Sequence, residues 1–334
     1  MKRSGIKVMG RLIGLVKPLT GFMILAIFMG VVGNLCASFI TILGGYAVTE
    51  FMGLSIPVSL KWIFALLGIF ALVRGLLRYA EQGCNHYIAF KLLALIRDKV
   101  FMALRKLTPA KLEGRDKGDL IALITSDIEL LEVFYAHTVS PVVIAILFSG
   151  ILSLFIGSFH WTLGVLSAAA YLTVGAVVPL VISRKSGDRG LAFRKQAGEL
   201  SGFVLDSMRG LDETIQYAQG SCRMAEMNEK SRSLVDRDGE LKSQAAKGTA
   251  SVGSLLIFFD FMMLLICAVL YSRGVVEADG VLIPTVALMS SFGPVVSLAN
   301  LGGTLQYTLA AGNRVLDLLI WSVSGFMTER ESCC

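Results

Sequence analysis

The chain alternates long apolar runs with charged stretches, and the apolar runs indicate its architecture. Each of these runs reaches about 20 residues, the length at which an α-helix crosses the roughly 30 Å hydrocarbon core of a bilayer. The pattern therefore predicts an all-α membrane protein with six transmembrane helices. The predicted spans cover residues 21–47, 61–81, 138–157, 161–182, 252–271 and 281–312.

Composition agrees with a membrane protein. Hydrophobic residues make up 54% of the 334 residues and charged residues only 17%, and the mean hydropathy is +0.69. A soluble domain of this length would carry more charge. The net charge of +6 places basic surfaces against anionic lipid headgroups, so we expect the lipid bilayer and not a nucleic acid as the partner of these surfaces.

Lysine and arginine are distributed unevenly between the connections. The three short connections, residues 48–60, 158–160 and 272–280, together contain only Arg273. The connections between spans two and three and between spans four and five hold most of the rest. The positive-inside rule then predicts a multi-pass protein of the cell membrane, with both termini and both long connections in the cytoplasm.

The long connections resemble helices that continue the spans into the cytoplasm. Residues 91–140 form a charged helical excursion that leaves the bilayer and returns to it. Residues 183–251 are rich in helix formers and contain no proline, which predicts two long helices that meet at a turn near Gly220. Residues 1–17 predict a basic amphipathic helix that lies on the membrane surface.

Three segments carry a family resemblance. They are RYAEQGCNHYIAFKLLALIR (78–97), LTPAKLEGRDKGDLIALITSDIELLEVFYAHTVSPV (107–142) and SGFVLDSMRGLDETIQYAQG (201–220). Together with the six spans they resemble the membrane domain of a type IV ABC exporter (ABC transmembrane type-1). The branch they resemble most is the subunit-C-like branch of the cysteine/glutathione (thiol reductant) exporter of cytochrome bd assembly. The resemblance makes residues 18–319 the transmembrane domain and leaves residues 320–334 as a tail outside the family pattern.

The resemblance implies the permease half of an ATP-driven exporter. Such a half forms the path for a small substrate, a thiol or an amino acid, and works in a homodimer or heterodimer. ATP and Mg²⁺ would bind to a nucleotide-binding domain, and the sequence contains neither the GxxxxGK[ST] phosphate loop nor the LSGGQ signature of that domain. We therefore expect the ATPase to be lost by truncation, displaced by a frame shift, or supplied by a separate polypeptide.

The resemblance also implies two cytoplasmic coupling helices that contact the ATPase. Apolar residues recur there at helical spacing on segments that have no bilayer to face, and Asp119 can cap the first helix. The alternative is that both apolar ridges pack inside the chain's own cytoplasmic bundle. The residues assigned to coupling are Gly118, Asp119, Leu120, Ile124 and Ile128 in the first helix, and Leu211, Asp212, Glu213 and Ile215 in the second.

Polar groups inside the spans suggest a substrate path, because ionisable side chains are costly at membrane depth. In span two Arg78 could grip a substrate carboxylate, or it could pair with Glu81 three residues along the helix. Asp260 in span five could contact a substrate amine or form a salt bridge with an arginine of span two. Glycine and proline in span six would permit bending. The residues assigned to the path are Arg74, Arg78, Glu81, Asn85, Asp260, Ser291, Asn300 and Gln306.

His86 is a candidate haem ligand by resemblance alone. Some members of the resembled exporter family bind haem through a histidine in the motif R-Y-x-E-R-x-x-x-x-H. The positions that match are Arg78, Tyr79, Glu81 and His86, and Gln82 replaces the second arginine. A structural histidine with hydrogen-bonded nitrogens is the alternative. No cysteine spacing is typical of zinc, so the sequence predicts no metal site.

Two other functions are compatible with a membrane chain of this kind. A non-transporting membrane scaffold or haem-sensing subunit would keep the spans without an ATPase. A secondary transporter would show inverted repeats with paired broken spans, and the sequence shows no such pairing.

Overall fold

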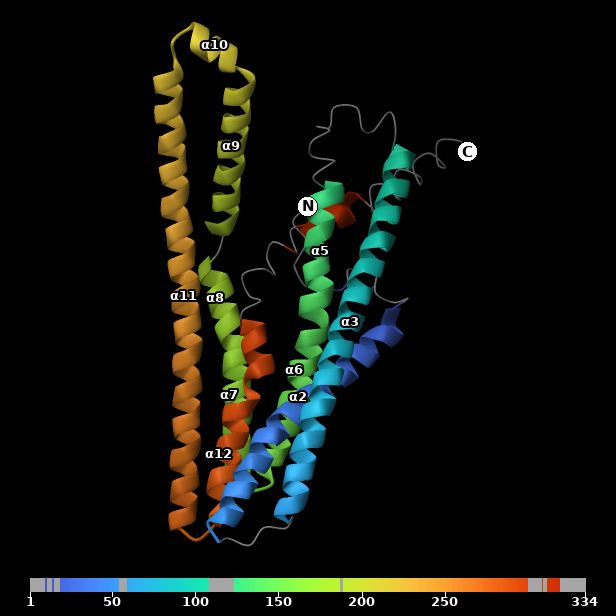
Figure 1. Ribbon diagram of the computed structural model, residues 1–334, viewed down its shortest axis with the longest axis vertical. Coiled ribbons are helices and arrows are strands. Elements are labelled where there is room, and N and C mark those ends of the chain that lie inside the picture. The colour runs from blue at the N-terminus through green and yellow to red at the C-terminus, as the bar shows by residue number, and fades with distance from the viewer. Residues whose placement is uncertain are drawn as a thin grey trace, which may run out of the picture. The chain divides into compact units, whose positions relative to one another are not determined.

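The structure is a computed structural model, and nearly every residue that it describes is helical (Figure 1). No β-strand occurs among these residues. The all-α fold predicted from the sequence is therefore confirmed. The structure describes residues 10, 14, 19–53, 59–107, 123–186, 189–299, 308 and 311–318. The predicted surface helix over residues 1–17 and the tail over residues 320–334 lie outside this set, apart from residues 10 and 14.

The helices follow one another with short connections in the described parts of the chain. Their bounds are α2 (Thr20–Phe51), α3 (Leu60–Leu107), η2 (Leu123–Asp127), α5 (Ile128–Phe134), η3 (Tyr135–Val139), α6 (Ser140–Gly157), α7 (Trp161–Leu172), η4 (Thr173–Val177), α8 (Val178–Ser186), α9 (Arg189–Arg209), α10 (Leu211–Gln216), α11 (Gly220–Ser272) and α12 (Asp279–Ser291).

Among the residues that the structure describes, six helices are long and apolar enough to cross a membrane, as the hydrophobic pattern predicts. They are Thr20–Phe51, Leu60–Arg105, Ser140–Gly157, Trp161–Ile182, Gly220–Ser272 and Asp279–Ala299. Two of them are far longer than a bilayer requires. At a rise of 1.5 Å per residue, the 48 residues of α3 and the 53 residues of α11 extend about 72 Å and about 80 Å, against about 30 Å of hydrocarbon.

The π-helical segments η3 and η4 each end two residues before a proline. Pro141 follows η3 and Pro179 follows η4. A proline nitrogen cannot donate a hydrogen bond, and its ring crowds the carbonyl four residues earlier, so the preceding turn widens. The spans therefore continue through both prolines with a local change of pitch.

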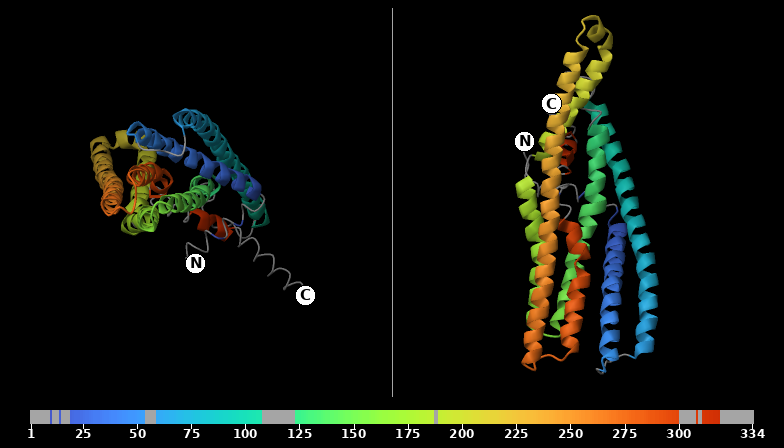
Figure 2. Two further views of the ribbon diagram at one scale, coloured as in Figure 1. Left: turned by 90° about the horizontal axis from the view of Figure 1, so that it is seen from below. Right: turned by 60° about the vertical axis from the view of Figure 1, so that its left-hand side comes forward.

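The chain divides into two compact units, and the first comprises residues 1–179 and 255–334. Within it α2 and α3 lie side by side, as both views of Figure 2 show in blue and cyan. The inner half of α3 supplies Ile88, Leu92 and Ile96 to a fully buried core. That core also contains side chains from α5 and from residues 311–318.

Two ion pairs lie at the same end of the first unit. Arg97 Nη2 is 3.8 Å from Glu129 Oε1 and joins α3 to α5. Arg314 Nε is 3.2 Å from Asp127 Oδ2, and the Asp127 carboxylate is nearly buried. The apolar core and the partly exposed pairs together hold this end of α3 against the return segment.

Spans three and four form a hairpin in which the two backbones nearly touch. A Cβ atom added to Gly164 of α7 would lie 2.8 Å from the Gly157 Cα and 3.0 Å from the Ser153 carbonyl oxygen of α6. Both neighbours are backbone atoms and cannot rotate away. Glycine at position 164 therefore permits the close approach of α6 and α7.

The second unit comprises residues 180–254 and contains α9, α10 and the first part of α11. Figure 1 shows α9 and α11 running alongside each other, with α10 closing the hairpin between them. Arg223 of α11 donates a 2.9 Å hydrogen bond to the Ser207 hydroxyl and lies 4.2 Å above the centre of the Phe203 ring. Lys230 lies 5.3 Å from the same ring centre. Cation–π contacts of this kind hold the two arms together.

The close approach at Gly164 makes a testable prediction. We expect G164A to lower the free energy of unfolding by about 1–3 kcal/mol, because the new methyl group has no space between two backbones. The matched control is G150A on α6, where an added Cβ meets no atom within 4 Å and alanine favours the helix. Thermal unfolding of the two variants in detergent measures the difference. A G164A midpoint equal to or above that of G150A contradicts the packing described here.

Candidate functional site

The polar stripe predicted on span two divides into an exposed half and a buried half on α3. Arg74 and Arg78 are exposed, whereas Glu81 and Asn85 are buried. Arg78 Nη1 donates to Glu81 Oε2 across 2.9 Å, so the ion pair that the sequence offered as one alternative is present. The Arg78 side chain is 60% exposed and that of Glu81 only 6%. The arginine therefore keeps donors available while it neutralises a buried carboxylate.

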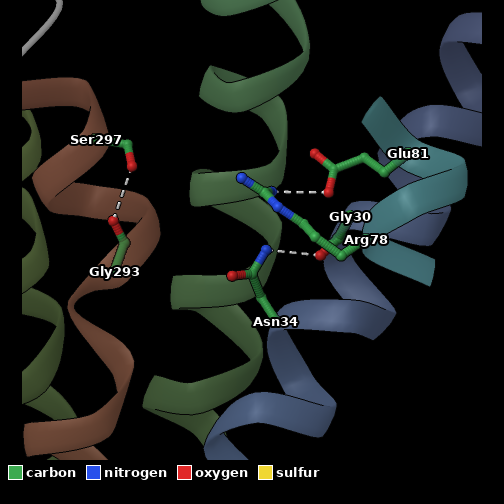
Figure 3. Close-up of polar contacts among 6 residues, drawn as sticks. All are labelled: Gly30, Asn34, Arg78, Glu81, Gly293 and Ser297. Carbon is green, nitrogen blue, oxygen red and sulfur yellow. Dashed lines mark hydrogen bonds and ion pairs between the residues drawn. The ribbon is translucent and has the colours of Figure 1, made fainter. Parts of the chain in front are cut away.

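Small residues on α2 make room for the buried carboxylate. A Cβ atom on Gly30 would lie 3.2 Å from the Glu81 carboxyl carbon and would overlap the Ile144 side chain of α6. Asn34, one turn further along α2, donates a 2.7 Å hydrogen bond to the Gly30 carbonyl oxygen. Figure 3 shows the Arg78 guanidinium of α3 with Glu81 and the Asn34 amide of α2 with the Gly30 carbonyl.

Two further buried polar atoms belong to the same region of the first unit. Asn85 Oδ1 on α3 and Ser140 Oγ at the start of α6 are buried and have no hydrogen-bond partner among the described residues. Buried polar groups normally find a partner, because an unpaired one costs free energy. The cluster of Arg78, Glu81 and Asn85 can therefore accept and donate further hydrogen bonds within the membrane region.

A second polar cluster joins two spans, α7 and α12, and contains a residue that sequence reasoning missed. The Tyr171 hydroxyl of α7 is hydrogen-bonded to the Ser291 hydroxyl of α12. The Tyr171 ring meets the Phe292 ring edge to face, with 5.8 Å between centroids. A tyrosine in an apolar span gives no periodic signal, and only its contact with Ser291 reveals it.

Asp260 of α11 does not form the salt bridge that we offered as one interpretation. Among the described residues it has no ion pair with Arg74 or Arg78, and its Oδ1 atom is buried without a hydrogen-bond partner. Arg78 pairs instead with Glu81, one turn away on the same helix.

The two predicted coupling segments differ in exposure. In the first, Gly118, Asp119 and Leu120 lie outside the described residues, Ile124 is half-buried, and Ile128 is fully buried against α3. Ile128 thus follows the alternative interpretation, in which the ridge packs inside the chain. Its partner is the inner half of α3, which periodicity alone could not specify.

The second segment coincides with α10 and exposes its apolar side chains. Leu211 is 54% exposed and Ile215 is 69% exposed, and they lie four residues apart on one face. Asp212 and Glu213 occupy the first turn of this helix, where negative charge complements the helix dipole. No residue of α10 is buried within the chain.

The remaining predicted positions are placed as follows. Ser291 is fully buried, and Asn300 and Gln306 lie outside the described residues. His86 is exposed on α3, and its ring stacks on Phe90 at 5.9 Å. In the part of the chain that the structure describes, no three His, Cys, Asp or Glu side chains gather to hold a metal ion.

Six helices long and apolar enough to cross a membrane, two of which extend well beyond the length that a bilayer requires, are the frame of a multi-pass membrane protein. The family model for the ABC transporter transmembrane region matches residues 23–295. The chain belongs to this family, as the sequence resemblance predicts.

Two relatives show what the chain resembles. It is 40% identical over 319 residues to a Haemophilus influenzae protein named "Probable ABC transporter ATP-binding/permease protein", covering 96% of this chain and 58% of that protein. It is 22% identical over 196 residues to the Bacillus subtilis "Glutathione/L-cysteine transport system ATP-binding/permease protein CydD", covering 57% of this chain and 33% of that protein. The chain thus spans only part of the length of these relatives.

The exposure of Arg78 generates a second prediction. In a background whose native cysteines are replaced by serine, we expect R78C to react with a charged, membrane-impermeant thiol reagent, because the thiolate forms only in contact with water. The matched control is L76C, which is also exposed on α3 but on the opposite side of the helix, where it would face lipid. Mass spectrometry of labelled membranes measures the modification. Equal labelling at both positions would exclude a water-filled cavity beside Arg78.

Proposed function

We propose that this chain is the permease half of an ATP-driven exporter, and that it couples to an ATP-binding domain through α10. Membership of the ABC transporter transmembrane region family supports the transport class. Both relatives carry names that join ATP binding to a permease. The observation that carries the coupling proposal is the exposed apolar face of α10.

The face of α10 is suited to docking on protein. Large apolar side chains at the end of a polar helical hairpin gain about 1.5–3 kcal/mol each when they are removed from water. Met208 and Tyr217, which flank the helix, are also exposed. The four side chains Met208, Leu211, Ile215 and Tyr217 would together fill a groove on the ATPase surface, and the acidic first turn would orient the contact.

The hairpin beneath α10 is built to transmit movement. Arg223 and Lys230 of α11 both pack on the Phe203 ring of α9, so the arms are clamped close to the end. The helix α11 then continues without interruption from Gly220 to Ser272, the last residue of span five. A displacement of α10 by the ATPase would thus be carried along one continuous helix into the membrane.

The chain would work beside a second half-transporter. The part of α11 that forms span five exposes large apolar side chains, among them Ile257, Phe261 and Leu264. A bilayer or the spans of a partner half can cover them. The lysine and arginine distribution supports an orientation with both termini in the cytoplasm.

A small thiol or amino acid is the proposed substrate. The Bacillus subtilis relative is named for glutathione and L-cysteine, and both carry a carboxylate. The exposed face of the Arg78 guanidinium offers donors in a planar fork that suits a carboxylate.

A haem-sensing role for the chain rests on a single observation. The exposed imidazole of His86 lies next to Phe90 on α3, where an aromatic side chain can contact a macrocycle. A Soret band in the purified protein that disappears in H86A would support this second function. We give transport the preference, because the family match concerns the whole set of spans.

Coupling through α10 is tested by restoring an ATPase. We propose to co-express the chain with the ATP-binding domain of the Haemophilus influenzae relative and to measure ATP-driven uptake of radioactive L-cysteine into inside-out vesicles. We expect the double variant L211A/I215A to abolish co-purification of the domain and to lower uptake by about tenfold or more, because it removes the docking surface.

The control for this experiment is V235A, which also removes an exposed apolar side chain from the second unit but lies away from α10. It should retain both co-purification and uptake. Unimpaired coupling in L211A/I215A would overturn the role of α10, and a lack of uptake with every ABC-type ATPase tested would overturn the exporter.

A further inference from the structure

We propose that span six bends at Phe292 during transport, and that hydrogen bonds from two other spans hold this hinge in the conformation described here. One bond comes from Ser38 of α2 and the other from Tyr171 of α7. The use of the hinge in transport rests on the proposed export function, whereas the break in the helix and the two bonds are features of this chain. All of these residues belong to the first unit.

The helix of span six is interrupted at one residue. The helix α12 ends at Ser291, Phe292 is not helical, and helical residues resume at Gly293. Beyond the break, Ser297 Oγ donates to the Gly293 carbonyl oxygen across 3.1 Å (Figure 3). Glycine weakens a helix, and Pro294 lacks an amide hydrogen and disfavours the helical conformation of the residue before it. The interruption is therefore a consequence of the local sequence.

The proline leaves a backbone carbonyl without its usual helical donor. In a regular helix the amide at position 294 would donate to the carbonyl of Ser290, four residues earlier. Instead Ser38 Oγ, which is buried on α2, donates to that carbonyl oxygen across 3.4 Å. Neighbouring helices and serine side chains can satisfy a backbone group that proline frees within a membrane. Ser38 thus compensates the break from a different span.

The second hydrogen bond lies directly before the break. The Tyr171 hydroxyl is bonded to the Ser291 hydroxyl, and Ser291 Oγ itself donates to the Leu288 carbonyl oxygen of α12 across 2.7 Å. A serine hydroxyl has a single proton, so the tyrosine is the donor in the bond between the two spans. The Tyr171 ring also meets the ring of Phe292, the residue at which the helix is interrupted.

The two sides of the break pack against different spans. Before it, Ile283 lies so close to Gly45 of α2 that a Cβ atom added to the glycine would be 3.2 Å from Ile283 Cδ1. After it, Val295 lies against Gly175 of η4, where an added Cβ atom would be 2.5 Å from Val295 Cγ1. A π-helical segment such as η4 often marks a functional site. A movement of span four relative to span one would be taken up at the break between these contacts.

Distances between spin labels in lipid nanodiscs test the hinge. In the cysteine-free background one label is attached to L154C on α6, and the second to S297C after the break or to M289C before it; all three positions are exposed. Double electron–electron resonance measures each distance distribution. We expect Y171F, which retains the ring, to increase a second population of the distance between positions 297 and 154 by about threefold to tenfold, the effect of one hydrogen bond. S38A should act less strongly, because its bond is longer.

The second label pair and a matched variant are the controls. The distance between positions 289 and 154 should stay unchanged in Y171F and S38A, because position 289 precedes the break. The matched variant is S167A, which removes a buried hydroxyl of α7 that donates to the Gly164 carbonyl of its own helix. It should leave both distance distributions unchanged.

Two results would contradict the hinge. The first is a distance between positions 297 and 154 that neither Y171F nor S38A alters, since the hydrogen bonds would then hold nothing in place. The second is an equal change in both label pairs, which would show that span six moves as one rigid helix.

A proline-free background tests the role of Ser38 by itself. P294A restores an amide that can donate to the Ser290 carbonyl in the ordinary helical pattern. In this background we expect S38A to have no further effect on the distance distribution. An effect of S38A that is as large with P294A as without it would overturn the assignment of Ser38 to the freed carbonyl.

These measurements need no ATPase and no substrate, so their outcome is separate from that of the uptake experiment. Distances that respond to Y171F and S38A, together with a lack of ATP-driven uptake, would retain the hinge and reject its use in export. Distances that do not respond, together with normal uptake, would overturn the hinge and retain the exporter.

Discussion

The first unit depends on the uninterrupted length of α3. Backbone amides and carbonyls that face lipid must be paired within their own helix, so a lipid-exposed span stays helical at membrane depth. The helix α3 satisfies this requirement across the bilayer and continues to Leu107. Beyond the membrane its inner half has no lipid to face, and Leu92, Ile96 and Val100 are buried instead against the return segment.

Two carboxylates within the spans are accommodated in contrasting ways. Glu81 is bound by Arg78 one turn earlier on α3, and Gly30 of α2 leaves space for its carboxyl group. Asp260 has no such neighbour among the described residues, and its Oδ1 atom is buried without a hydrogen-bond partner. A carboxylate that is paired with an arginine of its own helix can be buried between two helices at lower cost than an unpaired one.

The two cytoplasmic segments show a related division. The apolar ridge of the segment that leads into span three is buried in the chain's own core, at Ile128 and Leu131. The ridge on α10 remains exposed, although its supporting hairpin is firmly clamped by Phe203 and Arg223. A rigid arm that ends in an unsatisfied apolar face is the arrangement expected of a surface that docks on a second domain.

The sequence by itself determined the fold class, the number of spans and the family. Long apolar runs are local signals, and their length relates directly to the thickness of a bilayer. It also identified the polar positions on α3 and α11, because a charge in an apolar run is visible without any structure. Periodicity shows which side of a helix is apolar but not which neighbour covers it, and for this reason Ile128 was open to two interpretations.

Only the tertiary structure decided which polar side chains pair with one another. Whether Arg78 joins Glu81 or Asp260 depends on how α3 and α11 are rotated and placed, and the local pair at a distance of one turn prevailed. Tyr171 and Ser291 are 120 residues apart, and no pattern along the chain connects them. Their contact arises from the packing of α7 against α12, because hydrogen bonding between distant spans is a property of helix placement and not of local sequence.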